Sequence, residues 1–293
     1  MAQEPRPEEE RGPGQVPPTS SAELLAALLV PPALSIALRL AAPHLGFAAA
    51  FVTIPLALLT ILWVIWAVVR ARMHGLGLAA VLLVTAFAWL AALLPVWTGH
   101  TALGVAAVRN LALTVFGAAL GVALASAVRD RNLLVPAGIF AAAIDVAVVF
   151  WGPTGRAVEK VPQVVTQLSV HTHIPGTAAP PLAPGAPPLP PEILNIGFLD
   201  VLMAAFMLAA LLRFGMRSQR AFWHICFWWC VVALGAVVMA WPLPGWPFIV
   251  LGALVPNRDQ FRFSRGEKVA MGAAVGFALV AVWAVLWATK RMW

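Results

Sequence analysis

Long apolar runs alternate with short polar connections along most of the chain. A helix needs about 18 to 20 apolar residues to cross a bilayer. Eight runs have about this length, at roughly 22–42, 47–69, 76–97, 103–127, 133–151, 195–212, 222–240 and 269–289. A ninth apolar piece, 246–256, is too short to cross unaided, so we expect a half-span or a helix extended by its flanks. The pattern predicts an all-α polytopic membrane protein, a bundle of about eight to nine transmembrane helices.

The polar and proline-rich stretches divide the chain into four parts. Residues 1–21 are rich in proline, glutamate and glycine, a composition typical of a disordered tail. The first group of transmembrane helices occupies 22–132. Residues 133–256 hold the helices with the candidate motifs, together with a proline-rich extended linker at 174–192. A loop and a last transmembrane helix follow at 257–293.

Composition and charge fit a membrane protein better than a nucleic-acid-binding one. The chain of 293 residues is 61% hydrophobic and 11% charged, with a net charge of +7. In a soluble domain this charge would indicate nucleic acid, but here the arginines lie in short connections between apolar runs, where they act as topology signals. We therefore expect the lipid bilayer as a partner and no nucleic acid. Sixteen arginines against three lysines favour a prokaryote with a GC-rich genome, and hence its plasma (inner) membrane.

The basic residues gather in alternate connections. They include Arg70 and Arg72, then Arg129 and Arg131, then Arg213, Arg217 and Arg220, then Arg258, Arg262, Arg265 and Lys268. By the positive-inside rule these connections are cytoplasmic, and so is the N-terminus. The long connection 152–194 is then extracytoplasmic.

Small residues four apart indicate where helices approach closely. Gly117 and Gly121 form one such pair, and Gly272 and Gly276 form another. This spacing places both glycines of a pair on one helix face, which lets a neighbouring backbone come near. We interpret both pairs as packing positions.

Two acidic residues lie well inside apolar runs. Of the twelve Asp and Glu residues, only Asp145, in "AAAIDVAVVF", and Asp200, in "NIGFLDVLMAAF", are in this position. Asp145 precedes the 152–194 connection by about six residues, and Asp200 follows it by a similar number. At 1.5 Å per residue both lie roughly 8–9 Å from the same membrane face. Two antiparallel helices joined by that connection would hold the two carboxylates level.

Two carboxyl groups at one depth allow three interpretations. If they approach closely they form a dyad, in which one carboxylate activates water and the other, protonated, donates a proton to a carbonyl oxygen. An amide bond is then hydrolysed without a covalent intermediate. Alternatively, the two acids are hydrogen-bonded packing residues. A third possibility is a proton or cation relay in a transporter, where intramembrane acids also occur.

Three segments resemble the presenilin and signal peptide peptidase family. "AIDVAVVFWGPTGRAVE" is similar to the segment with the first catalytic aspartate, and "IGFLDVLMAAF" to the Gly-x-Gly-Asp segment with the second. "LPGWPFIVLG", residues 243–252, resembles the Pro-Ala-Leu motif. The order of the segments and the spacing between them also agree. The likeness covers about 133–256 and points to a divergent, prokaryotic-looking member of this group of intramembrane aspartyl proteases.

The resemblance implies an activity and a set of site residues. The implied activity is hydrolysis of peptide bonds in membrane-spanning helical substrates, with Asp145 and Asp200 as catalytic residues and no metal or cofactor. The implied substrate-binding residues are Gly197, Leu199, Pro244, Gly245, Trp246 and Pro247. A non-proteolytic relative, or a proton-coupled transporter that uses the same two acids, is the alternative.

The chain departs from the family pattern at the positions beside both acids. Ile144 precedes the first aspartate where the family has tyrosine, and Leu199 replaces the glycine before the second. Gly245 and Trp246 stand in place of Ala-Leu. Leu199 has a clear chemical consequence, because a small residue there lets the substrate backbone approach the acid. We expect Leu199 to crowd that approach.

Overall fold

A computed structural model of the chain describes most of its residues. The described ranges are 16–41, 47–97, 103–150, 168–173, 193–239 and 243–291. Most of the predicted disordered tail and the whole of the predicted linker at 174–192 lie outside them.

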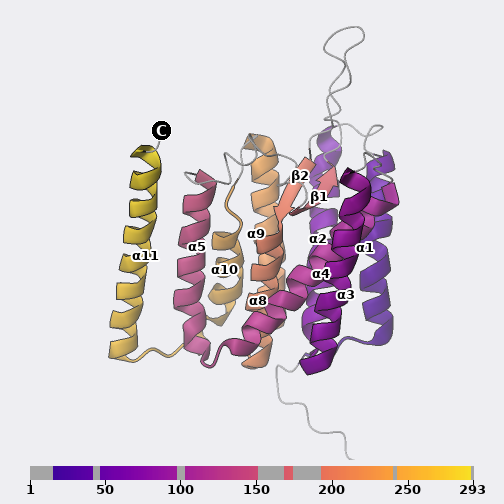
Figure 1. Ribbon diagram of the computed structural model, residues 1–293. Helices are drawn as coiled ribbons and strands as arrows, with labels where there is room; N and C mark the ends of the chain where they lie inside the picture. The colour runs from indigo at the N-terminus through magenta and orange to yellow at the C-terminus, as the bar shows by residue number, and fades with distance from the viewer. Residues whose placement is uncertain are drawn as a thin grey trace, which may run out of the picture.

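Within these ranges the chain forms nine α-helices and one β-hairpin (Figure 1). The helices are α1 (Ser21–Ala41), α2 (Ala50–Arg70), α3 (Gly75–Trp97), α4 (Leu103–Ala127), α5 (Leu134–Phe150), α8 (Phe198–Arg213), α9 (Ser218–Met239), α10 (Trp246–Leu254) and α11 (Arg265–Arg291). Three short 3-10 turns accompany them: η2 (Phe47–Ala49), η3 (Arg131–Leu133) and η4 (Val255–Gln260). The strands are β1 (Ser169–His173) and β2 (Ile193–Gly197).

Six of these helices are long and apolar enough to cross a membrane, so the chain has the build of a helical membrane protein. They are α1 to α5 and α9. Eight or nine spans were expected, and the described residues give fewer by this criterion. The difference comes from α8, with 16 residues, and from α11, which is not among the six, while α10, with nine residues, is the short ninth piece. The short α10 agrees with the prediction of a half-span in this region.

The predicted span at 195–212 begins as a strand. Residues 193–197 form β2, which pairs antiparallel with β1, and Val170 lies opposite Ile196. Both of these side chains are buried. Because the first residues are held by the partner strand, the helix starts only at Phe198. The hairpin therefore delivers the chain directly into α8.

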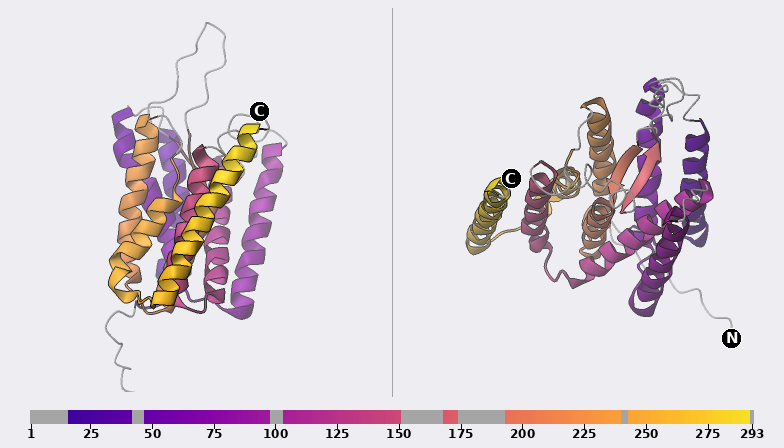
Figure 2. Two further views of the ribbon diagram at one scale, coloured as in Figure 1. Left: turned by 90° about the vertical axis from the view of Figure 1, so that its left-hand side faces the viewer. Right: turned by 45° about the horizontal axis from the view of Figure 1, so that its top comes forward.

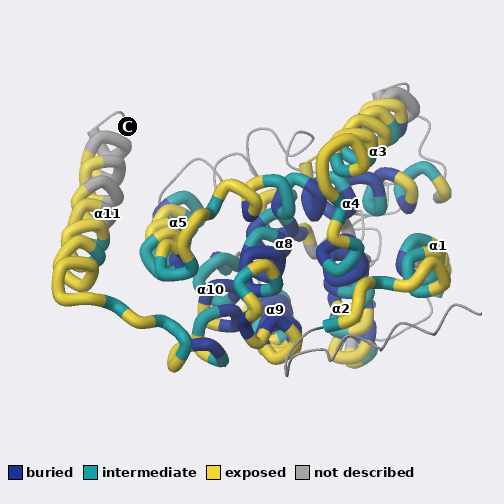
Figure 3. Tube along the Cα trace, turned by 90° about the horizontal axis from the view of Figure 1, so that it is seen from below, coloured by how far each residue is buried: buried dark blue, intermediate teal, exposed yellow. Residues whose placement is uncertain are grey.

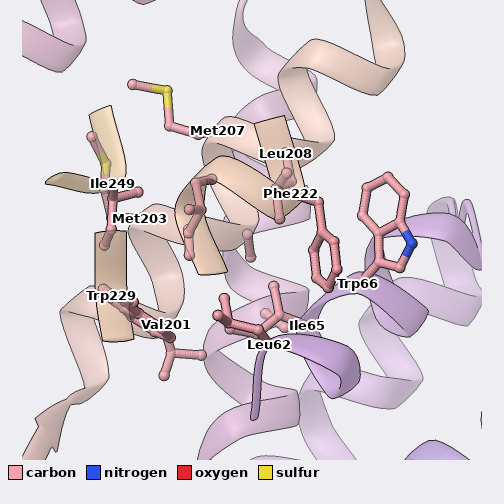
Figure 4. Packing of buried hydrophobic residues seen from close by; sticks show 14 of the residues in the cluster. Leu62, Ile65, Trp66, Val201, Met203, Met207, Leu208, Phe222, Trp229 and Ile249 are labelled. Atoms are coloured by element: carbon pink, nitrogen blue, oxygen red, sulfur yellow. The ribbon is translucent and has the colours of Figure 1, made fainter. Parts of the chain in front are cut away.

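The best-buried part of the bundle is formed by α2, α4, α8 and α9. The tube seen from below shows buried residues gathered on these helices, while α1, α3 and α11 lie toward the edge (Figure 3). Leu62 and Ile65 of α2 and Leu208 of α8 are almost fully buried, and Trp66 stacks on Phe222 with ring centroids 5.2 Å apart (Figure 4). Burial of large apolar side chains stabilises the arrangement by about 1.5–3 kcal/mol each relative to water. Within a bilayer, close packing is the more important term.

Glycines set the closest helix contacts. A Cβ atom added to Gly121 would lie 2.6 Å from the carbonyl oxygen of Leu202, so α4 and α8 touch through their backbones there. A Cβ atom added to Gly117, one turn earlier, would lie 3.1 Å from a ring carbon of Phe198, so this glycine packs against a side chain of α8. The packing interpretation of this pair is therefore confirmed. For Gly272 and Gly276 on α11 it finds no support, because no atom of the described residues lies within 4 Å of either Cβ position.

The arginine-rich connections gather at one end of the bundle, opposite the hairpin (Figure 1). Some of these arginines also hold the connections together. Arg213 donates to the carbonyl oxygen of Val128 at 2.8 Å, and Arg217 binds both carboxylate oxygens of Asp259 at 2.7 Å. The hydrogen bonds from Arg217 lower the pKa of the exposed Asp259 carboxyl.

Candidate active site

Asp145 lies in the last third of α5 and turns toward the start of α10. Its Oδ2 accepts a hydrogen bond of 2.9 Å from the backbone N–H of Trp246. The first N–H groups of a helix have no partner within the helix, so a carboxylate there satisfies one of them. The aspartate is half-buried. A single main-chain contact thus joins two segments about a hundred residues apart in the sequence.

Asp200 lies in the first turn of α8, at the end of the hairpin. Its Oδ2 accepts a hydrogen bond of 3.1 Å from the backbone N–H of Gly197, three residues earlier. This bond is made where β2 ends and α8 begins, and it fixes the direction in which the carboxylate points. The acidic residue at a helix N-terminus is also favoured by the helix dipole.

One peptide unit touches both carboxyl groups. The N–H of Trp246 binds Asp145, while a Cβ atom added to the preceding Gly245 would lie only 2.7 Å from Oδ1 of Asp200. The backbone of Gly245 therefore packs directly against the Asp200 carboxylate. A side chain at this position would require the Asp200 carboxylate or the turn to shift. The structure brings Asp145, Asp200, Gly245 and Trp246 into one site.

The helices α5, α8 and α10, which carry the four site residues, pack closely against one another near Gly138. α10 packs against both α5 and α8. A Cβ atom on Gly138 of α5 would lie 2.8 Å from the terminal methyl carbon of Met207 and 2.9 Å from Cγ1 of Val250. Met207 belongs to α8 and Val250 to α10, so Gly138 marks the point where the three helices meet. This contact fixes the spacing of the helices that present the two acids and the Gly245–Trp246 turn.

The other predicted substrate-binding residues lie around this site and differ in how far they are buried. Gly197 lies against Asp200, since an added Cβ atom would be 3.1 Å from its Oδ2. Pro244 is buried beside the turn, and Pro247 lies in the first turn of α10, where a missing N–H costs no helical hydrogen bond. Leu199 points away from the packed interior and is 55% exposed. It is therefore open to a molecule that approaches Asp200 from outside.

Sequence reasoning missed the hairpin and the anchor at its end. Phe198, the residue that begins α8, stacks on Phe116 of α4 with ring centroids 5.6 Å apart. It also faces Gly117, and the N–H of Phe198 donates to the carbonyl oxygen of Leu168 at 3.0 Å. These contacts fix the start of α8 and hence Asp200. The only signal in the sequence is the Gly117 position, which indicates a close neighbour but does not identify it.

The arrangement offers acid–base chemistry. Within the part of the chain that the structure describes, no group of three or more His, Cys, Asp or Glu side chains is placed to hold a metal ion. What the site presents is two carboxyl groups and the N-terminal turns of two helices. No family model, curated protein or solved structure matches the chain.

Proposed function

We propose that the protein is an intramembrane aspartyl protease, with Asp145 and Asp200 as the catalytic dyad. The observation that carries this proposal is that both carboxyl groups lie against one peptide unit, that of Gly245 and Trp246. The approach of two acids to one peptide unit from two elements supports a joint action on a peptide bond. The Gly245–Trp246 peptide stands in for a substrate peptide, and it must shift when a substrate binds.

The proposed reaction uses the two groups in opposite protonation states. One carboxylate removes a proton from a water molecule, and the water oxygen attacks the carbonyl carbon of the scissile bond. The other group, protonated, gives its proton to the carbonyl oxygen, so a neutral tetrahedral diol forms. When the diol collapses, the C–N bond breaks and the nitrogen takes the proton held by the first group. One diol hydroxyl returns its proton to the second group, which leaves a carboxylic acid, an amine and the dyad in its starting state. Two acids near one another cannot both ionise easily, which favours the singly protonated state.

The hairpin offers a place for the substrate backbone. Peptide bonds within a helix are shielded, so the substrate segment must become extended before it is cut. Within the described residues β2 pairs only with β1, and it leads within three residues to Asp200. An extended segment that adds to the other edge of β2 would run toward the dyad, with main-chain hydrogen bonds providing its affinity.

The same proposal includes the family and the setting. The motif likeness over 133–256 and the placing of its three segments around one site support membership of the presenilin and signal peptide peptidase family. We also propose that all nine helices lie in a prokaryotic plasma membrane, with the arginine-rich end of the bundle cytoplasmic. The substrates are single-span helical peptides.

Cleavage of such a peptide by the reconstituted protein tests the proposal. In liposomes, the wild-type chain should release two fragments whose masses identify one cut bond, while Asp145→Asn and Asp200→Asn should each abolish the cut. Asp130→Asn is the matched control. Asp130 accepts a hydrogen bond from the N–H of Asn132 outside the spans, and asparagine caps a turn equally well.

Two outcomes would speak against the proposal. Cleavage that persists in both dyad variants would mean that the acids do not act on the bond. Absence of cleavage in every form, together with a proton flux across the vesicle membrane that Asp145→Asn abolishes, would favour the transporter.

A further inference from the structure

A cluster of cations at the base of α11 forms a distinct surface feature. Arg262, Arg265 and Lys268 are exposed there, and Arg131 of η3 is half-exposed. We propose that this cluster, Arg131, Arg262, Arg265 and Lys268, binds the phosphate of an anionic phospholipid in the membrane leaflet at that end of the bundle. The proposal concerns a lipid site and is independent of the proposed protease activity.

Hydrogen bonds bring the two halves of the cluster together. Nδ2 of Asn132 donates to the carbonyl oxygen of Arg262 at 2.9 Å and to Oε1 of Glu267 at 3.4 Å. The turn before α5 and the segment before α11 therefore meet at Asn132, next to Arg131. At the start of α11, Arg265 and Lys268 are three residues apart, which places them on one face of the helix.

Three other arginines at this end of the bundle are held by protein partners, unlike the cluster cations within the described residues. Arg70 is paired with Glu23 at 2.8 Å, Arg213 donates to backbone carbonyl oxygens and Arg217 binds Asp259. Among the residues that the structure describes, none forms a hydrogen bond or ion pair with the side chains of the four cluster cations. These cations are free to bind a molecule from the surroundings.

The acids nearby are occupied by backbone groups. Glu267 accepts a hydrogen bond of 2.6 Å from the N–H of Ser264, and this bond, with others, lowers the pKa of its carboxyl. Asp130 accepts from the N–H of Asn132 at 2.9 Å. The four cations of the cluster thus outnumber the two nearby acids, whose carboxylates are already bound to backbone N–H groups. The cluster keeps an excess of positive charge, which complements a phosphate diester.

Apolar surface lies directly above the charges. α11 lies at the edge of the bundle and packs against α5 (Figure 2). Val269 follows Lys268 and is 73% exposed, while Leu133 follows Arg131 by two positions and is 52% exposed. A phospholipid can lay its acyl chains along these two helices while its phosphate reaches the cations. Basic sites at the ends of transmembrane helices bind anionic head groups in this way.

Native mass spectrometry of the full chain in detergent tests the site with phosphatidylglycerol and phosphatidylcholine as probes. The wild type should bind its first phosphatidylglycerol more tightly than phosphatidylcholine. The double variant Arg262→Gln/Arg265→Gln should weaken that first binding about 30-fold, because each basic residue near a lipid surface contributes about fivefold. Arg131→Gln/Lys268→Gln should give a similar loss from the other half of the cluster.

The matched control removes two charges elsewhere on the same face. Arg220 and Arg258 are both exposed, at the start of α9 and in η4. Arg220→Gln/Arg258→Gln should leave the binding of the first phosphatidylglycerol within about threefold of wild type. Equal losses in the control and cluster variants would overturn the proposal, since the effect would then be general surface charge. Displacement of the lipid by millimolar inorganic phosphate would also overturn it, in favour of a site for free anions.

Discussion

Backbone N–H groups hold the carboxylates of Asp145 and Asp200 at the candidate site. Trp246 supplies one of these groups and Gly197 the other. Main-chain donors place a carboxylate without neutralising it by a full charge, so each group can still take up or release a proton. The site therefore depends on the backbone path of the Gly245–Trp246 turn as much as on the two acids.

Gly245 is the residue on which this path depends most directly. In Gly245→Ala the new Cβ atom would lie 2.7 Å from Oδ1 of Asp200, a distance that real Cβ atoms essentially never show. Either the turn or the carboxylate must move. We expect cleavage to fall at least tenfold and the free energy of unfolding to fall by about 1–3 kcal/mol, as for overpacked positions. A cleavage assay and thermal unfolding of the purified variant measure the two effects.

Gly272→Ala is the control for that substitution. Gly272 lies inside α11, and none of the described residues has an atom within 4 Å of its Cβ position, so alanine there should leave cleavage unchanged. It should also raise stability slightly, because alanine is the better helix former. Loss of cleavage in both variants would contradict the role given to Gly245.

Leu199→Gly tests whether the residue beside Asp200 restricts the substrate. Leu199 is exposed, so its removal costs little packing, and the helix penalty of glycine is about 1 kcal/mol or less near a helix end. Without the leucine side chain, the backbone of a substrate with large side chains can come closer to Asp200. We expect faster cleavage of model helices with large residues at the cut bond. Adding Asp200→Asn must abolish this gain, and unchanged cleavage in the folded Leu199→Gly protein would contradict the crowding hypothesis.

At the scale of elements, the contact of α4 with α8 positions the Asp200 helix in the bundle. Gly121 meets the backbone of Leu202 and Phe206, and backbone cannot move aside as a flexible side chain can. Gly121→Ala should therefore lower the free energy of unfolding by about 1–3 kcal/mol. Gly276→Ala on α11 should change it by less than about 0.5 kcal/mol. Thermal unfolding of both variants in the same detergent tests this, and equal destabilisation would contradict the assignment of only Gly121 to a helix contact.

Much of this arrangement could be predicted from the sequence, because hydrophobic length determines where helices form in a membrane protein. The apolar runs gave the helices, and the shared depth of Asp145 and Asp200 indicated that they could meet. The strand at 193–197 could not be predicted in this way, since its apolar residues continue into those of α8 and its partner β1 lies across the proline-rich linker.

The packing of the two glycine pairs shows a second limit. Gly117 and Gly121 contact α8, whereas Gly272 and Gly276 meet no neighbour in the described part of the chain, although both pairs have the same spacing. The spacing shows which face of a helix carries small residues, but not whether another helix packs against that face. In the same way, the sequence placed Gly245 and Trp246 near the acids and gave no sign that one peptide would touch both.

At the scale of the whole molecule, the arginine-rich connections and the hairpin lie at opposite ends of the bundle (Figure 1). By the positive-inside rule, we expect the hairpin on the extracytoplasmic side of the membrane. To test this, Cys226 and Cys230 are replaced by alanine and a single cysteine is introduced at Asn195 in β2 or at Arg220 in α9. A membrane-impermeant maleimide added to intact cells should label the first variant and not the second. The reverse pattern would mean that the protein is inserted the other way round.

The central claim is that Asp145 and Asp200 act as one pair, and the pH dependence of cleavage tests it most directly. Two coupled carboxyl groups lose their protons in separate steps, so one shared proton exists only between two apparent pKa values. The account predicts a bell-shaped rate profile for the reconstituted protein, with activity falling as the pair gains a second proton at low pH and as it loses its last one at high pH. Asp130→Asn should leave both limbs in place. A rate that rises through the acid range and never falls at higher pH would contradict the shared-proton dyad.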